Sequence, residues 1–520
     1  MNGAEALLRS LVASGVTTCF ANPGTSEMQF VAALDRVTEM RSVLTLFEGV
    51  ATGAADGYGR VAGRPAATLL HLGPGLANGT ANLHNARRAR TPLVNLVGDH
   101  ATYHQRFDSP LQSDLWSIAR TVSAWQRATT RAEDVGADAA DAVAASLGPP
   151  GGIATLIVPA DVTWNDGAAV EPRRDRAPAL LVPPAHVERI AGILRAPEPA
   201  ALLIGGSAMG EQGLVAAARV AAATGTKLFC ETFPAVHARG GGLPNVEKIA
   251  YFGEMAAAQL SGVRHLVLAG ARAPVSFFAY PGKPSDPVPS ECTVVELAGP
   301  GVDVVEALDS LAAALHAPDA HAPGGTRGSG GGGRPERPSG RLTPESMALA
   351  VGHLLPEGAV VVDESVTSGL SVPAATAGCP RHEWLALAGG SIGQGLPVAT
   401  GAAVAAPGRR VISLEADGSA LYTIQSLWTQ AREGLDVTTV VLVNRSYAIL
   451  QIELARVGAS GSGERAGAML DLSRPDLDFV AIAQGMGVPA SRATTADELA
   501  ALLERSIDED GPSLIEAVFG

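Results

Sequence analysis

Residues 410–419 read RVISLEADGS, and residues 437–447 read VTTVVLVNRSY. Each stretch begins as a strand of apolar and β-branched residues, and a polar turn with Asp417 or Asn444 follows it. The intervening residues favour a helix, so the segment predicts a βαβ crossover whose two strands run in the same direction. Asp417 and Asn444 should therefore emerge at the same carboxyl edge of a parallel sheet.

A carboxylate and an amide oxygen at one sheet edge suit a hard cation such as Mg²⁺, which usually also takes phosphate oxygens and water. Gly418 lets a phosphate approach the backbone, and the amides around Ser419 can bind it where the next helix begins. The alternative is an ordinary turn at Asp417 and an ordinary strand end at Asn444. The separation of 27 residues, with a strand on each side, favours a ligand site.

A second motif, FEGVATGAADGYGR at residues 47–60, places Glu48 where a strand passes into a helix rich in Ala and Gly. A carboxylate among such apolar neighbours is poorly solvated and can share a proton. The alternative is a glutamate that only caps a helix N-terminus, a common position for acidic residues.

A third motif is the loop GGSIGQGLP at residues 389–397, whose Ile392 lies 25 residues ahead of Asp417. Alone, a glycine-rich loop of this kind often only permits close packing of a helix. Its place ahead of the predicted cation site gives it functional weight.

Composition and rhythm predict the fold class. The chain has 520 residues, of which 47% are hydrophobic and only 4% aromatic, so its cores must consist largely of aliphatic residues, as in parallel sheets covered by helices. Short β-like runs alternate with helical stretches throughout. We therefore expect an α/β protein of three domains, each a parallel sheet flanked by helices: residues 1–170, 183–315 and 343–520, with a flexible linker at 316–342 rich in Gly, Pro and Ser.

Charge and hydropathy exclude several function classes. The net charge of −14 and the lack of a basic stretch interleaved with aromatics argue against nucleic acid as a partner. No apolar stretch approaches the roughly 18 residues of a membrane span, and residues 1–10 lack the basic flank and apolar core of a signal peptide, so we expect a cytoplasmic protein without membrane contact. The four cysteines stand singly, without the spacing of a zinc site or a redox pair.

Together the three motifs resemble those of the thiamine diphosphate enzyme superfamily, in the group of acetolactate synthase, benzoylformate decarboxylase and pyruvate oxidase, over nearly the whole chain. The resemblance implies a pyrimidine-binding domain, a middle domain and a diphosphate-binding domain, with thiamine diphosphate and Mg²⁺ as cofactors. Two positions depart from the family's GDG and NN signature, since Ala416 replaces its first Gly and Val443 its first Asn.

The resemblance also implies individual roles. Glu48 would bond to the aminopyrimidine ring and promote its imino form, which then removes the C2 proton. Ile392 would wedge the cofactor into its bent conformation, and the carbonyl of Gly390 would accept a hydrogen bond from the aminopyrimidine. The metal ligands would be Asp417, Asn444 and the carbonyl of Ser446; further cofactor contacts would come from Gly418, Ser419, Tyr447, Ser365 and Thr367.

The substrate pocket resembles that of benzoylformate decarboxylase in residues 22–27 (NPGTSE) and at Leu70-His71. By that resemblance Thr25 and His71 would contact the substrate and move protons. Thr25 could instead be only a turn or capping residue, and His71 a core histidine.

Other pocket positions agree only in part. The middle-domain segment that carries a second active-site His in the decarboxylase has Phe277, Phe278 and Tyr280 and no His. Either Tyr280 substitutes for that His or proton delivery differs. Leu450 stands where pyruvate decarboxylases have an acidic residue, and it should leave room for a bulkier or less polar acyl group. Glu453, one turn further, either supplies a carboxylate to the pocket or lies on an exposed helix surface; we favour the second interpretation.

Three hypotheses follow. The leading one is non-oxidative decarboxylation of a 2-oxo acid, with His71 in proton delivery. The second is an acetolactate synthase-like carboligation, in which a second carbonyl captures the acyl unit. The third, motivated by Ala416 and Val443, is a catalytically silent homologue. FAD in the middle domain is possible but unsupported, since residues 205–207 (GGS) are too generic. The resemblance implies a homodimer or homotetramer with active sites at the subunit interface.

Overall fold

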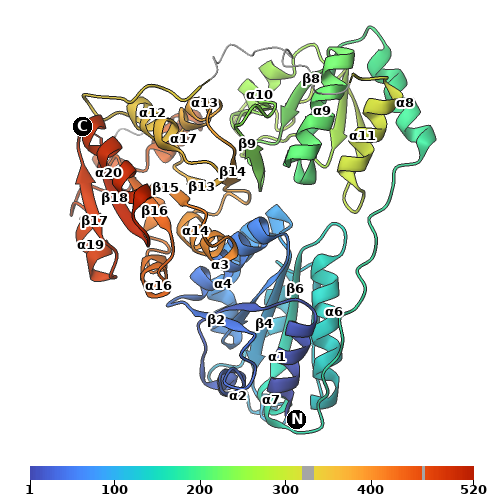
Figure 1. Ribbon diagram of the computed structural model, residues 1–520, viewed down its shortest axis with the longest axis vertical. Coiled ribbons are helices and arrows are strands. Elements are labelled where there is room, and N and C mark those ends of the chain that lie inside the picture. Colours follow the sequence, from blue (N-terminus) through green and yellow to red (C-terminus); the bar gives the residue numbers. More distant parts are fainter. Residues whose placement is uncertain (319–332, 460–462, 520) are drawn as a thin grey trace.

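The computed structural model describes residues 1–318, 333–459 and 463–519, and Figure 1 shows their arrangement. Three β-sheets, each flanked by helices, confirm the predicted α/β fold class. No helix among the described residues is long and apolar enough to cross a membrane.

The first sheet is formed by the N-terminal part of the chain and is parallel throughout. Its strand order is β2 (Arg41–Leu44), β1 (Thr18–Ala21), β3 (Ala66–Leu70), β4 (Leu93–Asp99), β6 (Ile153–Pro159) and β5 (Trp125–Ala128). One face packs on α3 (Glu48–Ala62), α4 (Leu72–Ala89) and α5 (Leu115–Arg120). The other face packs on α1 (Gly3–Ala13), α2 (Met28–Ala33), α6 (Val135–Leu147) and α7 (Ala160–Trp164).

The second sheet lies in the middle of the chain and is also parallel. Its order is β10 (Glu247–Lys248), β8 (Lys227–Cys230), β7 (Ala200–Ile204), β11 (His265–Ala269) and β12 (Thr293–Ala298). The helices α8 (Pro184–Arg195), α9 (Glu211–Thr224) and α11 (Val304–Ala314) share one core with it, and α10 (Gly253–Gln259) packs into a smaller core.

The third sheet has the order β17 (Ala490–Ala493), β18 (Ser513–Val518), β16 (Val437–Val443), β15 (Val411–Ala416), β13 (Ala359–Glu364), β14 (His382–Ala386) and β9 (His237–Arg239). All its strands are parallel except β9, which pairs antiparallel with β14. Because β9 comes from the middle of the chain, the middle segment contributes to two sheets. Its flanking helices include α12 (Pro344–Leu354), α14 (Gly395–Ala405), α16 (Ser426–Glu433), α19 (Phe479–Gly485) and α20 (Ala496–Asp508).

The first and third sheets are joined by the helices α3 and α14, which lie side by side between them (Figure 1). One hydrophobic core runs through both, from Phe20 on β1 to Val411 on β15. Glycines allow this close crossing: a Cβ atom on Gly401 would overlap the carbonyl oxygen of Ala54, and one on Gly57 would overlap backbone atoms of Val398. The small residues of the GVATGAADGYG run thus serve helix packing.

The segment predicted as a linker is described only in part. Residues 319–332 of it lie outside the described residues. The part that follows contacts the third region, because Arg337 pairs with Glu504 at 2.8 Å and the amide of Gly340 donates to Asp497 at 2.7 Å. These contacts restrain this end of the segment, although its composition predicts a flexible linker. Thr343 then caps the next helix, α12, with Pro344 in its first turn.

Candidate functional site

The carboxyl edge of the third sheet gathers the predicted cofactor and metal residues. Strand order runs outward from β13 to β14 on one side and from β15 to β16 on the other, so the order reverses between β13 and β15. Ligands of open α/β sheets bind in the crevice at such a reversal. Ser365 and Thr367 follow β13, Asp417 follows β15, and Asn444 follows β16.

Asp417 and Asn444 meet at this edge, as the crossover predicts. Oδ2 of Asp417 accepts the backbone N–H groups of Asn444 and Arg445, at 3.1 and 2.7 Å, and Oδ1 accepts that of Gly418 at 2.9 Å. Asp417 is 2% exposed, and burial raises the pKa of its carboxyl while these three amides oppose the rise. The backbone therefore fixes both carboxylate oxygens without neutralising the charge.

The donor set around Asp417 fits a hard cation that shares its ligands with phosphate. Oδ1 of Asn444 accepts the N–H of Ser446 at 2.9 Å, which orients the amide oxygen and leaves it a further lone pair. Among the described residues, no group of three or more His, Cys, Asp or Glu side chains could hold a metal. A cation at this edge would thus need amide, carbonyl and phosphate oxygens, the ligands that Mg²⁺ accepts.

Three of the predicted cofactor contacts lie in tight surroundings. The ring of Tyr447 covers Gly418 so closely that a Cβ atom there would overlap it. Ser419 is buried and donates to the carbonyl of Ala416 at 3.0 Å, in the four-residue helix α15 (Asp417–Ala420). Ser365 is buried as well and donates to Asp363 at 2.5 Å.

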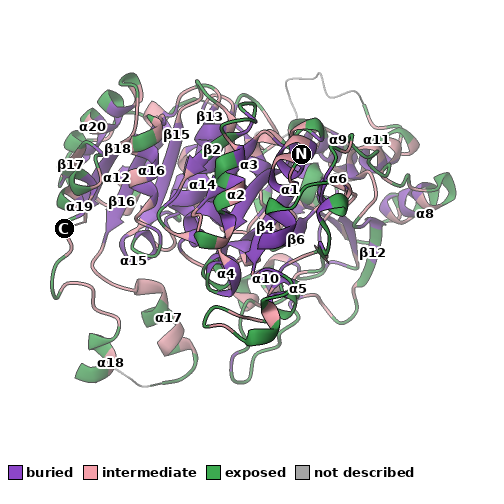
Figure 2. Cartoon of the chain, turned by 90° about the horizontal axis from the view of Figure 1, so that it is seen from below, coloured by how far each residue is buried: buried purple, intermediate pink, exposed green. Residues whose placement is uncertain are grey.

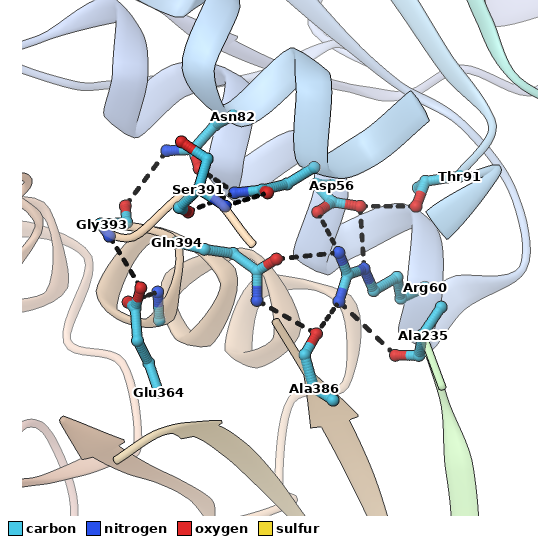
Figure 3. A network of polar contacts seen from close by, with 12 residues as sticks. Asp56, Arg60, Asn82, Thr91, Ala235, Glu364, Ala386, Ser391, Gly393 and Gln394 are labelled. Carbon is cyan, nitrogen blue, oxygen red and sulfur yellow. Dashed lines mark hydrogen bonds and ion pairs between the residues drawn. The ribbon is translucent and has the colours of Figure 1, made fainter. Parts of the chain in front are cut away.

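The loop 389–395 carries Gly390 and Ile392 and is held from both sides (Figure 3). From the first sheet, Asn82 donates to the carbonyl of Gly393 at 3.2 Å, and Asn85 bonds both the N–H and the carbonyl of Ser391. From the third sheet, Glu364 accepts the N–H of Gly393 at 2.7 Å. This loop is therefore fixed before any ligand arrives.

Within that loop, Gly390 adopts a left-handed conformation with φ of +77°, which explains the glycine. Its carbonyl oxygen accepts no hydrogen bond from the described residues and remains available to a ligand. Ile392 is half-buried, as a side chain that contacts a bound molecule would be.

Glu48 is the first residue of α3 and is 7% exposed. Oε2 accepts a hydrogen bond of 3.0 Å from Nδ2 of Asn78 on α4, a residue not identified from the sequence. Asn82 joins the surroundings of Glu48 to the loop, because its amide donates both to the carbonyl of Gly49 and to that of Gly393.

His71 lies at the carboxyl end of β3 and belongs to a polar cluster that sequence reasoning missed. Its Nδ1 lies 2.9 Å from Oε2 of Glu27 and 3.1 Å from Oγ of Ser26. Glu27 is 2% exposed, accepts the N–H of Gly24 at 2.7 Å and also bonds Ser26. Thr25 is exposed at the start of the 3₁₀ turn η1 (Thr25–Glu27), and it is Ser26 that contacts the imidazole. The available sequence signal for Glu27 was an acidic residue three positions after Gly24.

Three of the six non-glycine residues with positive φ in the described part of the chain lie at the turns that carry these residues. Leu72, Val366 and Arg445 have positive φ values of 51°, 49° and 58°. They directly follow His71, Ser365 and Asn444. Non-glycine residues in this region cost about 1–3 kcal/mol each and concentrate where function requires the geometry. The three predicted site turns are therefore held against their local preference.

A buried ion pair connects the helix of Glu48 to both other regions (Figure 3). Arg60 donates two hydrogen bonds to Asp56, of 2.9 and 2.6 Å. The exposed fraction of the side chain is 1% for Arg60 and 0% for Asp56. The same guanidinium donates to Gln394 at 3.1 Å, to the carbonyl of Ala386 at 2.8 Å and to that of Ala235 at 3.5 Å. One side chain thus contacts the first, second and third regions.

Two carboxyl groups are buried together beneath the loop 389–395. Burial raises the pKa of Glu364 to about 7, against opposing hydrogen bonds from the amides of Gly395, Gly393 and Gln394. Burial and the neighbouring Glu364 raise the pKa of Glu415 well above its usual value. Both carboxyl groups therefore bind a proton more readily in the folded protein than they would in water.

The predicted pocket residues of the middle region form an aromatic wall. The rings of Phe277 and Phe278 lie 5.6 Å apart, and Phe277 also contacts Tyr251 at 5.1 Å between ring centroids. Phe277 packs on the loop, since a Cβ atom on Gly390 would lie 2.9 Å from its ring. Leu450 is 46% exposed.

Tyr280 and Glu453 form a contact that sequence analysis did not predict. The hydroxyl of Tyr280 donates to Oε2 of Glu453 at 2.6 Å. The side chain of Glu453 is only 16% exposed, so the interpretation of an exposed helix surface is wrong. The tertiary contact with the middle region, which helical periodicity does not reveal, is the physical reason.

Comparisons with known proteins agree on one family. Residues 1–121 match the model of the thiamine pyrophosphate enzyme N-terminal TPP binding domain, and residues 371–517 that of the C-terminal TPP binding domain. A protein of Mycobacterium tuberculosis, provisionally named an acetolactate synthase large subunit, is 60% identical over 100% of this chain and 99% of its own length. Benzoylformate decarboxylase of Pseudomonas aeruginosa is 28% identical over 96% of each chain.

Solved structures extend the likeness to the fold. A thiamine diphosphate-dependent 4-hydroxybenzoylformate decarboxylase of Rhodococcus jostii superimposes with a TM-score of 0.87 at 24% identity, over 100% of both chains. The arrangement of all three sheets is thus shared with that structure.

Proposed function

Because the chain belongs to the thiamine pyrophosphate enzyme family, we propose that it is a 2-oxo acid decarboxylase that uses thiamine diphosphate and Mg²⁺. The observation that carries the proposal is the His71–Glu27–Ser26 cluster, which lies at the same sheet edge as Glu48 and would transfer protons there. Bound thiamine diphosphate would supply a nucleophilic C2 for the keto carbon and a thiazolium ring that accepts the electron pair left on the acyl carbon when CO₂ departs.

Cofactor binding would be divided between the two sheet edges. Asp417, Asn444 and the carbonyl of Ser446 would hold Mg²⁺, and Gly418 and Ser419 would border the diphosphate. Support comes from the convergence of these residues at the reversal of strand order. Ser365, Thr367 and Tyr447 would complete this half of the site.

The proton chemistry would fall to Glu48 and His71. Glu48 would share a proton with the aminopyrimidine ring, and its orientation would be kept by Asn78. The carbonyl of Gly390 would accept from the amino group of that ring, and Ile392 would support the bent conformation. His71, oriented by Glu27, would deliver a proton to the acyl carbon after CO₂ has left.

Carboligation of the acetolactate synthase type is the second candidate function. The name of the relative with 60% identity favours it, and so does the aromatic wall, which offers no imidazole from the middle region. Thr25, on the open side of the His71 cluster, would contact the substrate in either case.

A homodimer or homotetramer with active sites at the subunit interface is part of the proposal. It is supported by large apolar side chains that flank the third sheet's carboxyl edge in an exposed position: Leu370 and Met469, each 79% exposed, and Tyr422 at 54%. A second subunit would cover them.

Product analysis tests the proposal. The protein, Mg²⁺ and thiamine diphosphate are incubated with small, branched and aromatic 2-oxo acids, and CO₂, aldehyde and acyloin are measured by mass spectrometry. Aldehyde equal to the CO₂ released supports decarboxylation, whereas acyloin as the main product supports carboligation. No turnover of any acid would reject both.

A further inference from the structure

The helix α17 (Ala448–Arg456) directly follows the predicted metal loop and carries Leu450, yet none of its residues is buried. In Figure 2 it projects from the body of the molecule together with α18 (Glu464–Ala468). A helix without a buried face gains little from packing and needs specific contacts to keep its position.

Those contacts come from the middle region. Arg456, at the end of α17, pairs with both carboxylate oxygens of Glu254, at 2.5 and 2.9 Å. Its guanidinium also lies 4.2 Å from the ring centroids of both Phe252 and Tyr280. An arginine between two aromatic rings and opposite a carboxylate combines cation–π attraction with a bidentate ion pair.

A second contact lies one turn earlier on α17. Glu453 accepts the Tyr280 hydroxyl at 2.6 Å, while its other oxygen is buried and has no donor among the described residues. The same carboxylate lies 3.9 Å from Nε of Arg456, so the two side chains of α17 support each other's contacts with the middle region. Tyr280 therefore contributes twice, through its ring to Arg456 and through its hydroxyl to Glu453.

The contact continues to the cofactor loop. Leu450 and Glu453 are three residues apart and so lie on one face of α17. On the middle region, Phe252, which Arg456 contacts, lies 5.1 Å from Tyr251 between ring centroids, and Tyr251 lies 5.1 Å from Phe277. Phe277 in turn packs on Gly390 of the cofactor loop. A shift of α17 relative to the middle region would therefore move Leu450 relative to the aromatic wall.

We propose that Tyr280, Glu254, Glu453 and Arg456 form a clamp that positions α17, and that the clamp determines substrate specificity by holding Leu450 opposite Phe277. The role in substrate specificity rests on the proposed function, whereas the positioning of α17 does not. The four residues are positioning residues and take no part in the chemistry.

Hydrogen exchange measured by mass spectrometry tests the clamp without any substrate. Arg456→Met replaces the guanidinium with an unbranched apolar side chain. We expect the amides of residues 448–456 in this variant to exchange about tenfold faster or more, because the helix opens locally. Tyr280→Phe removes one hydrogen bond and should give a smaller increase in the same segment. The matched control is Arg465→Met on α18, an exposed arginine, which should leave this exchange unchanged. Equal exchange in Arg456→Met and the wild type would overturn the clamp.

The effect on substrate is measured with the loaded enzyme. Arg456→Met should raise KM for a bulky 2-oxo acid about tenfold, change kcat less, and leave the Kd of thiamine diphosphate unaltered. A fall in kcat with an unchanged KM would overturn the specificity role. If the wild type turns over no 2-oxo acid, the proposed function fails, while the exchange result still decides the clamp.

Discussion

Oδ2 of Asp417 accepts the backbone N–H of Asn444 at 3.1 Å, across 27 residues of sequence. The bond joins the ends of two parallel strands and builds the edge at which we place the metal. The same carboxyl is buried, which raises its pKa, while the backbone amides of Arg445, Gly418 and Asn444 oppose the rise. A cation at this edge would favour the charged form in the same direction as these amides.

We therefore expect Asp417→Ala to weaken binding of thiamine diphosphate in the presence of Mg²⁺ by about 100-fold or more, because the cation loses its one carboxylate ligand. Titration calorimetry measures this directly. Asp309→Asn, on the exposed surface of α11, is the control and should bind like the wild type. Equal Kd values for Asp417→Ala and the control would remove Asp417 from the metal site.

Calorimetry on the wild type also decides the hypothesis of a silent homologue. Saturable binding of thiamine diphosphate that disappears when EDTA removes Mg²⁺ is the expected result. If no saturable binding is seen, the departures at Ala416 and Val443 would account for a lost cofactor site, and a structural or regulatory role would be favoured.

The His71 cluster predicts a change of product. In His71→Ala, protonation of the acyl carbon should slow, so that a second carbonyl captures more of the acyl unit and the acyloin-to-aldehyde ratio rises. Glu27→Gln should lower kcat by about 10- to 100-fold, because the imidazole loses the carboxylate that orients it. Mass spectrometry of the products gives both quantities. An unchanged product ratio and kcat would exclude His71 from proton delivery.

Arg60 predicts a large effect on stability. Arg60→Met leaves Asp56 charged and buried, and we expect a loss of about 3–5 kcal/mol in the free energy of unfolding. Adding Asp56→Asn should cost little more, since the unpaired charge is then gone. Urea denaturation followed by circular dichroism measures both variants. A loss below about 1 kcal/mol for the single variant would contradict the account of the pair.

The Glu364–Glu415 pair predicts a pH dependence. Both carboxyls have folded-state pKa values above their ordinary value, so the native state binds more protons than the unfolded state. Their contribution to stability is present below about pH 4.5 and is lost as the pH rises through about 7, the pKa of Glu364. Glu415→Gln removes one of the two carboxyls. We therefore expect the change that it causes in the free energy of unfolding to be more favourable at pH 8 than at pH 5 by about 1–3 kcal/mol.

Thermal unfolding of Glu415→Gln and the wild type at both pH values provides the test. Ser413→Ala removes a hydrogen bond of 2.7 Å to Glu415 without removing a carboxyl, and it serves as the matched control. A gain that is the same at pH 5 and pH 8 would show that packing, not ionisation, is responsible.

Sequence reasoning located much of this architecture because local patterns determine it. The alternation of strands and helices predicts the parallel sheets, and the βαβ crossover predicts that Asp417 and Asn444 meet. The three residues of β9 carry too little pattern to be recognised, and their pairing with β14 depends on contacts between distant segments.

Side-chain partners were harder to predict. Asn78 and Asn82 look like ordinary helix residues in the sequence, yet they bond Glu48 and the loop 389–395 because α3, α4 and that loop pack together. The exposed surface expected for Glu453 is occupied by Tyr280 for the same reason. Such partners depend on the tertiary arrangement, which no local pattern contains.

The central claim is that this chain decarboxylates a 2-oxo acid by means of a cofactor activated by Glu48. Its most direct test is the rate of CO₂ release by the wild type and by Glu48→Gln, each saturated with thiamine diphosphate and Mg²⁺. The account predicts release by the wild type and a rate lower by about 10²- to 10⁴-fold in the variant, with cofactor binding retained. Equal rates in the two proteins, or no release from any 2-oxo acid by the cofactor-bound wild type, would contradict it.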